Sequence, residues 1–158
     1  MMELDKESVI GVLNKILELE LAGVVRYTHY SLLIFGNNRI PIVSWLRDQA
    51  DESLMHAQRA GEMVTHLGGH PSLAIGPLLE THKHNIGDIL HESLDHERCA
   101  LVEYKHLLEL TKDRSVMLEE YARELVYQEE LHAGEVDKML RKPGDIAVFS
   151  DTQYFSAF

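Results

Sequence analysis

The sequence is short of cysteine and proline, and these shortages limit what the protein can be. The single cysteine, Cys99, excludes an internal disulfide and any cysteine-based zinc or iron–sulfur cage. Only four prolines interrupt the chain, which leaves room for long helices. A chain of 158 residues is nevertheless long enough for one domain that buries a core without covalent staples.

Long apolar runs are also missing. No stretch approaches the roughly 18 uninterrupted apolar residues that a membrane span needs. The opening segment, Met1 to Ser8, lacks the basic region followed by an apolar run that marks a signal peptide. We therefore expect a cytoplasmic protein in a reducing compartment, without a membrane partner.

Basic residues are scarce, with 15 lysines and arginines against 26 aspartates and glutamates, which gives a formal net charge of −11. A nucleic-acid surface needs a basic face, so we expect no nucleic-acid partner. The negative charge is compatible with attracting cations, although many soluble proteins are acidic for solubility alone.

Four long segments carry apolar residues at steps of three and four, the spacing of a core-facing helical stripe. Glycine, asparagine or proline punctuates most of the breaks between them. No alternating apolar–polar run is long enough for a sheet, so the sequence predicts an all-α fold. The predicted helices cover about residues 5–35, 41–69, 79–110 and 114–141.

The connections between these segments constrain the topology. The first and third connections are short, which favours antiparallel neighbours. The middle connection, residues 70–77, is longer and contains two prolines and a glycine. We predict a four-helix bundle over residues 1–142, with antiparallel helix pairs joined by one long crossover, followed by an irregular tail at 143–158. An up-down bundle is the alternative.

Each helical stripe is interrupted near its middle by a carboxylate, and two of the stripes add a histidine on the same face. Burying one unpaired carboxylate costs at least several kcal/mol. A domain of this size has a net stability of only about 5–15 kcal/mol. Two divalent cations would match the four charges; protonation, or pairing with Arg26 or Arg59, is the alternative. The residues concerned are Glu20, Glu52, His56, Glu97, Glu129 and His132.

The two halves of the chain repeat this pattern. Three pairs of residues share a spacing of 77, namely Glu20 with Glu97, Tyr27 with Tyr104, and Glu52 with Glu129. Carboxylate and imidazole without thiolate suit iron or manganese, with zinc able to compete. Glutamates from two helices and glutamate–histidine pairs from two others are typical of di-iron and di-manganese bundles.

Three segments resemble the bacterioferritins of the ferritin-like superfamily. The stretch from Leu13 to Leu21, followed by Tyr27, is similar to their first helix. The stretch from Leu67 to Leu73, after His56-Ala57, is similar to the end of their second helix and its exit loop. Glu129-Glu130-Leu131-His132 matches the Glu-x-x-His of their fourth helix. The similarity covers about residues 10 to 140.

This resemblance implies a ferritin-like four-helix bundle that oxidises Fe(II) with dioxygen or hydrogen peroxide at two iron ions. It implies that Glu20 and Glu97 are terminal ligands, that Glu129 bridges the metals, and that His56 and His132 complete the site. The rival functions are a rubrerythrin-like peroxidase or oxidase on the same site, and a non-catalytic metal-binding or scaffold bundle.

The second helix departs from the family pattern. Ser53 occupies the position of the family's glutamate, three residues before His56, whereas Glu52 lies four before it. Residues at i and i+4 still share a helical face, and a π-bulge would absorb the extra residue. We predict Glu52 as the ligand; the alternative is a solvated Glu52 and a site with one ligand fewer.

Two further departures concern haem and assembly. Leu54 stands where the family has its haem-ligating methionine, and Met55 faces another direction, so we predict no haem. The tail shows no fifth-helix pattern, so we expect a homo-oligomer, a dimer or larger, rather than a 24-subunit cage. Apolar tail residues are expected to dock on the bundle or on a partner: Ile146, Val148, Phe149, Tyr154, Phe155 and Phe158.

Tyr27 and Tyr104 each lie two turns from a glutamate of their own stripe. We consider a hydrogen bond to a ligand or a redox role, chiefly for Tyr27; the alternative is a plain core aromatic. Histidines near the crossover, at positions 66, 70, 82 and 84, are expected to be exposed loop residues rather than a minor metal site. The remaining histidines, at 29, 91, 96 and 106, lie off the stripes and receive no role.

Overall fold

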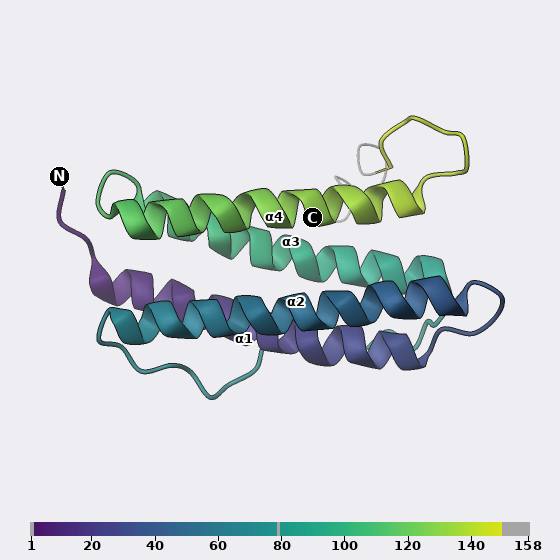
Figure 1. The fold of residues 1–158 in the computed structure, drawn as a ribbon, viewed down its shortest axis with the longest axis horizontal. Helices are drawn as coiled ribbons and strands as arrows, with labels where there is room; N and C mark the ends of the chain where they lie inside the picture. Colours follow the sequence, from purple (N-terminus) through teal and green to yellow (C-terminus); the bar gives the residue numbers. More distant parts are fainter. Residues whose placement is uncertain (1, 79, 150–158) are drawn as a thin grey trace.

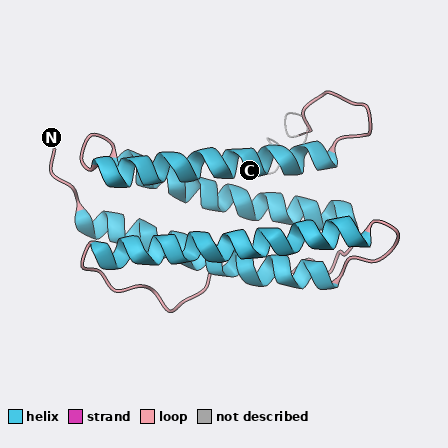
Figure 2. Ribbon diagram, in the orientation of Figure 1, coloured by secondary structure: helices cyan, strands magenta, loops and turns pink. Residues whose placement is uncertain are grey.

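A computed structural model describes residues 2–78 and 80–149. In it, four long helices pack side by side (Figure 1). Within these residues Figure 2 shows helices and loops and no strand, which confirms the all-α prediction. No helix found there is both long and apolar enough to cross a membrane. The helices are α1 (Lys6–Leu32), α2 (Arg39–His66), α3 (Ile86–Thr111) and α4 (Val116–Leu140).

Polar side chains fix where three of the helices begin. Asp5, Asn85 and Ser115 each accept a hydrogen bond from a backbone N–H in the first turn of α1, α3 and α4. Such caps satisfy N–H groups that have no partner inside the helix. At the other end of α2, Gly68 adopts a φ of +83°, and the Gly69 N–H donates to the Val64 carbonyl at 2.9 Å. This left-handed glycine stops the helix where the sequence predicts it.

The predicted start of the third helix at residue 79 is wrong, because α3 begins at Ile86. Two local features stop the helix from starting earlier. His82 has a φ of +57°, in the left-handed region that cannot continue a right-handed helix. Asn85 then turns its side chain to the Asp88 N–H, at 2.9 Å, as the cap. The crossover therefore runs from Leu67 to Asn85, well beyond the predicted residues 70–77.

The order of the helices in space settles the topology. Figure 1 shows α2 and α3 running in the same direction, whereas α1 and α4 run in the opposite one. The most extensive contacts are those of α1 with α2 and of α3 with α4, and α1 also packs against α3. Two antiparallel pairs are therefore joined by a crossover that passes along the bundle, as predicted, and the up-down alternative is wrong.

The crossover is tied to α1 by several hydrogen bonds. The Asn14 side chain donates to the His70 carbonyl at 3.1 Å and accepts from the Ser72 N–H at 2.9 Å. The Gly76 N–H donates to the Glu18 carbonyl at 2.8 Å. A Cβ at position 76 would lie 3.1 Å from that carbonyl oxygen, so glycine permits this close approach. These bonds hold the connection against the outer side of α1.

Apolar side chains fill the two ends of the bundle and leave a polar layer between them. One end is packed by residues such as Leu13, Ile16, Leu107 and Leu125. The other end contains two smaller apolar clusters, one around Ile34 and Leu46 and one around Leu90 and Leu94. The mid-length carboxylates lie between these ends and are held in place by apolar packing on both sides.

The first tail residues return to the bundle. The Phe149 ring meets the His91 ring edge to face, with 5.1 Å between centroids, and its N–H donates to Asp137 Oδ1 at 3.3 Å. Docking on the bundle is thus seen for Phe149, whereas Ile146 is 89% exposed and does not dock. The aromatic residues Tyr154, Phe155 and Phe158 lie outside the described residues.

Candidate metal centre

All four helices contribute to one polar cluster at the middle of the bundle, which we call the central cluster. Glu20, His56, Glu97 and Glu129 are buried, with 1–7% of each residue exposed. The side chains of Glu52 and His132 are 27% and 20% exposed. The structure therefore brings together all six predicted residues, and the cluster meets solvent on the side of Glu52 and His132.

The central cluster contains two groups of possible ligands that share Glu129. One group is Glu20, His56 and Glu129, and the other is Glu97, Glu129 and His132; in each, one ligand atom per residue lies within 4.8 Å of the others. His56 Nδ1 is 3.4 Å from Glu20 Oε1 and 3.2 Å from Glu129 Oε1. The second oxygen of Glu129, Oε2, lies 3.9 Å from His132 Nδ1. One carboxylate thus presents an oxygen to each group.

Glu52 lies beside both imidazoles. Its Oε1 is 3.1 Å from His132 Nε2 and 3.8 Å from His56 Nε2. Helix α2 is a continuous α-helix throughout, so the π-bulge proposed from the sequence is wrong. The ordinary i, i+4 relation alone brings Glu52 and His56 onto one face. A Glu52 that points away into solvent is also wrong, and its role as a ligand stays a prediction.

A close approach of α1 and α2 explains why position 53 is a serine. Ser53 is buried, and a Cβ added at Gly23 would lie 2.8 Å from its Oγ and 3.1 Å from His96 Nε2. No room for a longer side chain remains there. His96, to which the sequence gave no reason to assign a role, is also buried, and burial lowers its pKa, so the ring stays neutral. Position 52 is the adjacent place on α2 from which a glutamate reaches the cluster.

The outer face of α2 carries the residues considered for haem. Leu54 and Met55 are 42% and 51% exposed, so neither side chain belongs to the central cluster. Met55 therefore lies at the surface, as its helical position predicts. The absence of haem stays a prediction.

Burial dominates the electrostatics of the carboxylates. It raises the pKa of Glu129 well above its ordinary value, with a further increase from the neighbouring Glu97 charge. Burial also raises the pKa of Glu20. At Glu97 burial acts in the same direction, but hydrogen bonds from Glu129 and Tyr27 outweigh it and lower the pKa. In the metal-free protein these shifts favour the protonated form of Glu129 and the charged form of Glu97.

Arginine does not neutralise this charge. Arg59 pairs with Glu124, at 3.1 and 2.9 Å, and Arg26 lies 3.7 Å from Glu92. The pairing of these arginines with the central carboxylates, left open from the sequence, is therefore wrong. Within the described chain the ion pairs of Glu20 and Glu129 are with histidine alone. Protons or metal ions remain as the compensating charge.

The two tyrosines bind the glutamates in a crossed arrangement. The Tyr27 hydroxyl donates to Glu97 Oε1, and the Tyr104 hydroxyl donates to Glu20 Oε1 at 2.8 Å. Each tyrosine therefore holds the glutamate of the other helix pair, not the one on its own stripe, which is two turns away. Burial raises the pKa of both phenols well above their ordinary value, so both remain neutral donors. The hydrogen bond predicted for Tyr27 is present.

Sequence reasoning missed one polar neighbour of the cluster. Gln128 Oε1 lies 3.0 Å from His56 Nε2, and the Gln128 amide donates to Glu124 at 3.0 Å. This contact orients the His56 ring so that Nδ1 faces Glu20 and Glu129. Gln128 directly precedes Glu129 and lies off the stripe, so helical periodicity gives no signal for it.

Comparison with known proteins agrees with this geometry. A model of the ferritin family, described as a ferritin-like domain, matches residues 10–144. No curated protein matches the sequence. Among solved structures, a ferritin-like di-iron carboxylate protein from Bacillus anthracis superposes with a TM-score of 0.82 at 20% identity, over 89% of this chain and 100% of that one.

Two further structures share the fold. The dodecameric thioferritin of Bacteroides fragilis, described as a bacterioferritin-related protein, gives a TM-score of 0.81 at 23% identity, over 87% of both chains. The bacterioferritin of Desulfovibrio desulfuricans, whose di-iron site was studied in different catalytic states, gives 0.77 at 20% identity. That match covers 85% of this chain and 79% of the other. At such identities the likeness establishes the fold alone.

We expect Glu129→Gln to stabilise the metal-free protein as the pH rises. Because the folded-state pKa of Glu129 is raised above 4.5, its protonated form stabilises the fold at low pH, and this contribution is lost as the pH rises through the folded pKa. The side chain of the variant stays neutral, so the free energy of unfolding of the variant should rise relative to that of wild type by up to about 1.4 kcal/mol per pH unit within that window. Chemical denaturation in the presence of a chelator between pH 5 and 8 measures this difference. The prediction would be contradicted if the unfolding free energies of the two proteins changed with pH in the same way.

Replacing Ser53 by glutamate, the residue found at this position in the bacterioferritins, should damage the fold. The longer side chain meets α1 at Gly23 and brings a carboxylate into a packed helix contact, which should cost at least about 3 kcal/mol. Thermal unfolding checks this, with Asp51→Glu, an exposed position on the same helix, as the control. A variant as stable as wild type would show that α1 and α2 separate more easily than their packing implies.

Proposed function

The chain belongs to the ferritin family as a ferritin-like domain, and from this premise we propose that its central cluster binds two metal ions and oxidises Fe(II) with dioxygen or hydrogen peroxide. The observation that supports this most directly is Glu129. Its buried Oε2 has no hydrogen-bond partner, although an unpaired buried oxygen is costly. That oxygen faces the second of two ligand groups that share this one carboxylate.

The donor set fits a pair of iron ions. Four carboxylates and two imidazoles without thiolate suit iron or manganese, with zinc as a competitor. We propose that Glu20 and His56 hold one ion, that Glu97 and His132 hold the other, and that Glu129 is shared by the two. Glu52, beside both imidazoles, is proposed as the sixth ligand. Bound Fe(II) would supply two electrons per pair, which with two protons reduce dioxygen to hydrogen peroxide, or hydrogen peroxide to water.

The protein's own groups prepare the site for this reaction. Tyr27 and Tyr104 hold Glu97 and Glu20 by hydrogen bonds, so two carboxylates are oriented in advance. A proton held by Glu129, whose pKa burial raises, must leave when cations bind, so binding releases it to solvent. Glu52 and His132 lie on the side that meets water, where ions and oxidant would enter.

Oxygen consumption on addition of Fe(II) tests this function. We expect uptake well above that of buffer in the wild type and a fall to the buffer rate in Glu129→Ala, because both ligand groups lose a member. Glu130→Ala removes the exposed neighbouring carboxylate and should keep the wild-type rate. Elemental analysis after loading should give about two irons per wild-type chain.

Either of two results would refute this function. A wild-type rate equal to that of buffer with both oxidants would exclude the reaction. Equal rates in Glu129→Ala and wild type would show that iron is oxidised elsewhere. A rate seen with peroxide and absent with dioxygen would assign peroxide as the oxidant.

We also propose that copies of the chain assemble with one another, in the cytoplasm. Large apolar side chains are exposed on two helices, with Leu54 and Met55 on α2 and Tyr127 and Leu131 on α4, each 42–65% exposed. Such residues are candidates for an interface between copies. The free, exposed Cys99 is in keeping with a reducing compartment. Native mass spectrometry should show a dimer or larger; a monomer at micromolar concentration would refute the assembly.

A further inference from the structure

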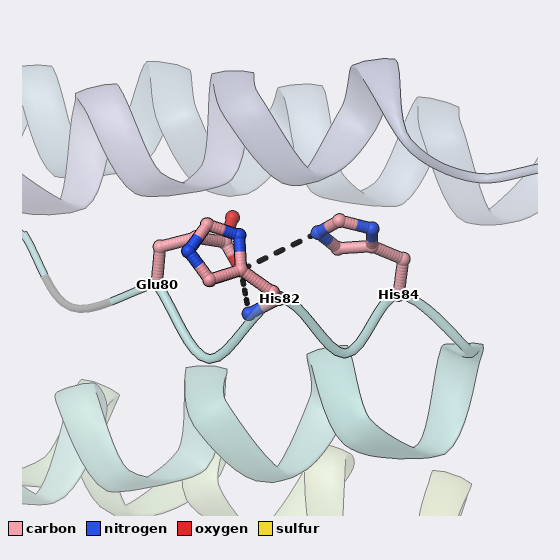
Figure 3. A group of neighbouring side chains, drawn as sticks. All are labelled: Glu80, His82 and His84. Atoms are coloured by element: carbon pink, nitrogen blue, oxygen red, sulfur yellow. Dashed lines mark hydrogen bonds and ion pairs between the residues drawn. The ribbon is translucent and has the colours of Figure 1, made fainter.

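A second group of metal-ligating side chains lies outside the bundle, in the crossover just before α3. Figure 3 shows Glu80, His82 and His84 gathered on one side of this segment. One ligand atom from each of the three lies within 4.8 Å of the other two. The central cluster contains none of these residues. His82 and His84 are exposed loop histidines, as the sequence predicts, and they are also grouped with Glu80.

Glu80 is the centre of the group, and each of its oxygens has a defined neighbour. Its Oε1 accepts from the His82 N–H at 2.7 Å and lies 3.4 Å from His84 Nε2. Its Oε2 lies 2.6 Å from Nε2 of His29, on α1. The carboxylate is therefore fixed between the crossover and α1, with its orientation set by the ring of His29.

Backbone geometry supplies the convergence. The left-handed φ of +57° at His82 bends the segment so that its N–H reaches Glu80. Histidine is one of the residues that tolerate this conformation. This bend gathers the possible metal ligands of the sequence Glu-Thr-His-Lys-His on one side of the segment.

The charges of this group suit a cation. The hydrogen bond from His29 lowers the pKa of Glu80 to about 2, together with the His82 N–H, so the carboxylate is ionised at neutral pH. Neutral imidazole is the commonest metal ligand in proteins. Two imidazoles and one carboxylate form a set of three protein ligands that leaves a coordination position open for water. Glu80 and His29 also line a pocket of about 240 Å³, to which His82 and His84 do not contribute.

We propose that Glu80, His82 and His84 bind one divalent transition-metal ion, of the class of Zn²⁺ or Fe²⁺, with His29 as the residue that positions Glu80. The simpler view is that these side chains only fasten the crossover to α1. The two views differ in what happens when zinc is added. Binding at this place is independent of the central cluster, because the two share no residue.

Zinc titration by calorimetry on the full-length chain tests the proposal. We expect His82→Ala/His84→Ala to bind one ion per chain fewer than the wild type. This difference does not depend on whether the central cluster also binds zinc, so failure here and failure of the proposed function are distinguishable. His106→Ala is the matched control, because His106 is exposed and lies near one carboxylate, Glu103, at 3.9 Å. It should bind as many ions as the wild type.

Any one of three results would overturn the proposal. Equal stoichiometry in the wild type and the double variant would show that no ion binds here. Half an ion per chain together with a doubled native mass would show that zinc bridges two copies. If the double variant loses its helical circular dichroism, the test uses Glu80→Gln instead, because glutamine keeps the shape of the side chain and removes its charge. Its affinity for the ion should fall at least about tenfold, as expected when a metal ligand or its close partner is removed; unchanged affinity would also overturn the proposal.

Discussion

Glu97 and Glu129 lie close together inside the bundle, and among the described residues no arginine or lysine forms an ion pair with either of them. The burial of these two carboxyl groups governs the rest of the structure. Such groups stay buried only when protons or cations compensate them. The apolar clusters at both ends of the bundle supply the stability that this polar layer lacks. The same packing prevents the carboxylates from turning out to water. The carboxylates are therefore held inside the bundle although their burial is electrostatically unfavourable.

The two helix pairs depend on one another through their tyrosines. Tyr27 on α1 holds Glu97 on α3, and Tyr104 on α3 holds Glu20 on α1. The spacing of 77 residues between equivalent positions reflects this exchange, since each half supplies the donor that the other half needs. Neither helix pair could orient its own glutamate in this way alone. The geometry of the cluster is accordingly a property of the complete bundle.

Most of the fold follows from the sequence, and the local deviations do not. Helical periodicity predicts four helices and an inward carboxylate on each, because burial of apolar stripes dominates the energy. The start of α3 is missed, since the left-handed His82 and the Asn85 cap act through backbone geometry that periodicity does not register. The closeness of Glu52 to both histidines depends on helix rotation. The narrow contact at Gly23 and Ser53, the buried His96 and the pairing of His29 with Glu80 depend on contacts between distant segments.

The central cluster meets water on one side, where Glu52 and His132 are half-buried. One carboxylate and one imidazole therefore line this solvent-exposed side of the cluster. A carboxylate there attracts positive ions, while the imidazole can take up the protons that they displace. If a neighbouring copy of the chain covered this side, ions leaving the cluster would enter a space between the two molecules instead of the bulk solution. Under the proposed function, the exchange of ions at this side would then depend on how the molecules assemble.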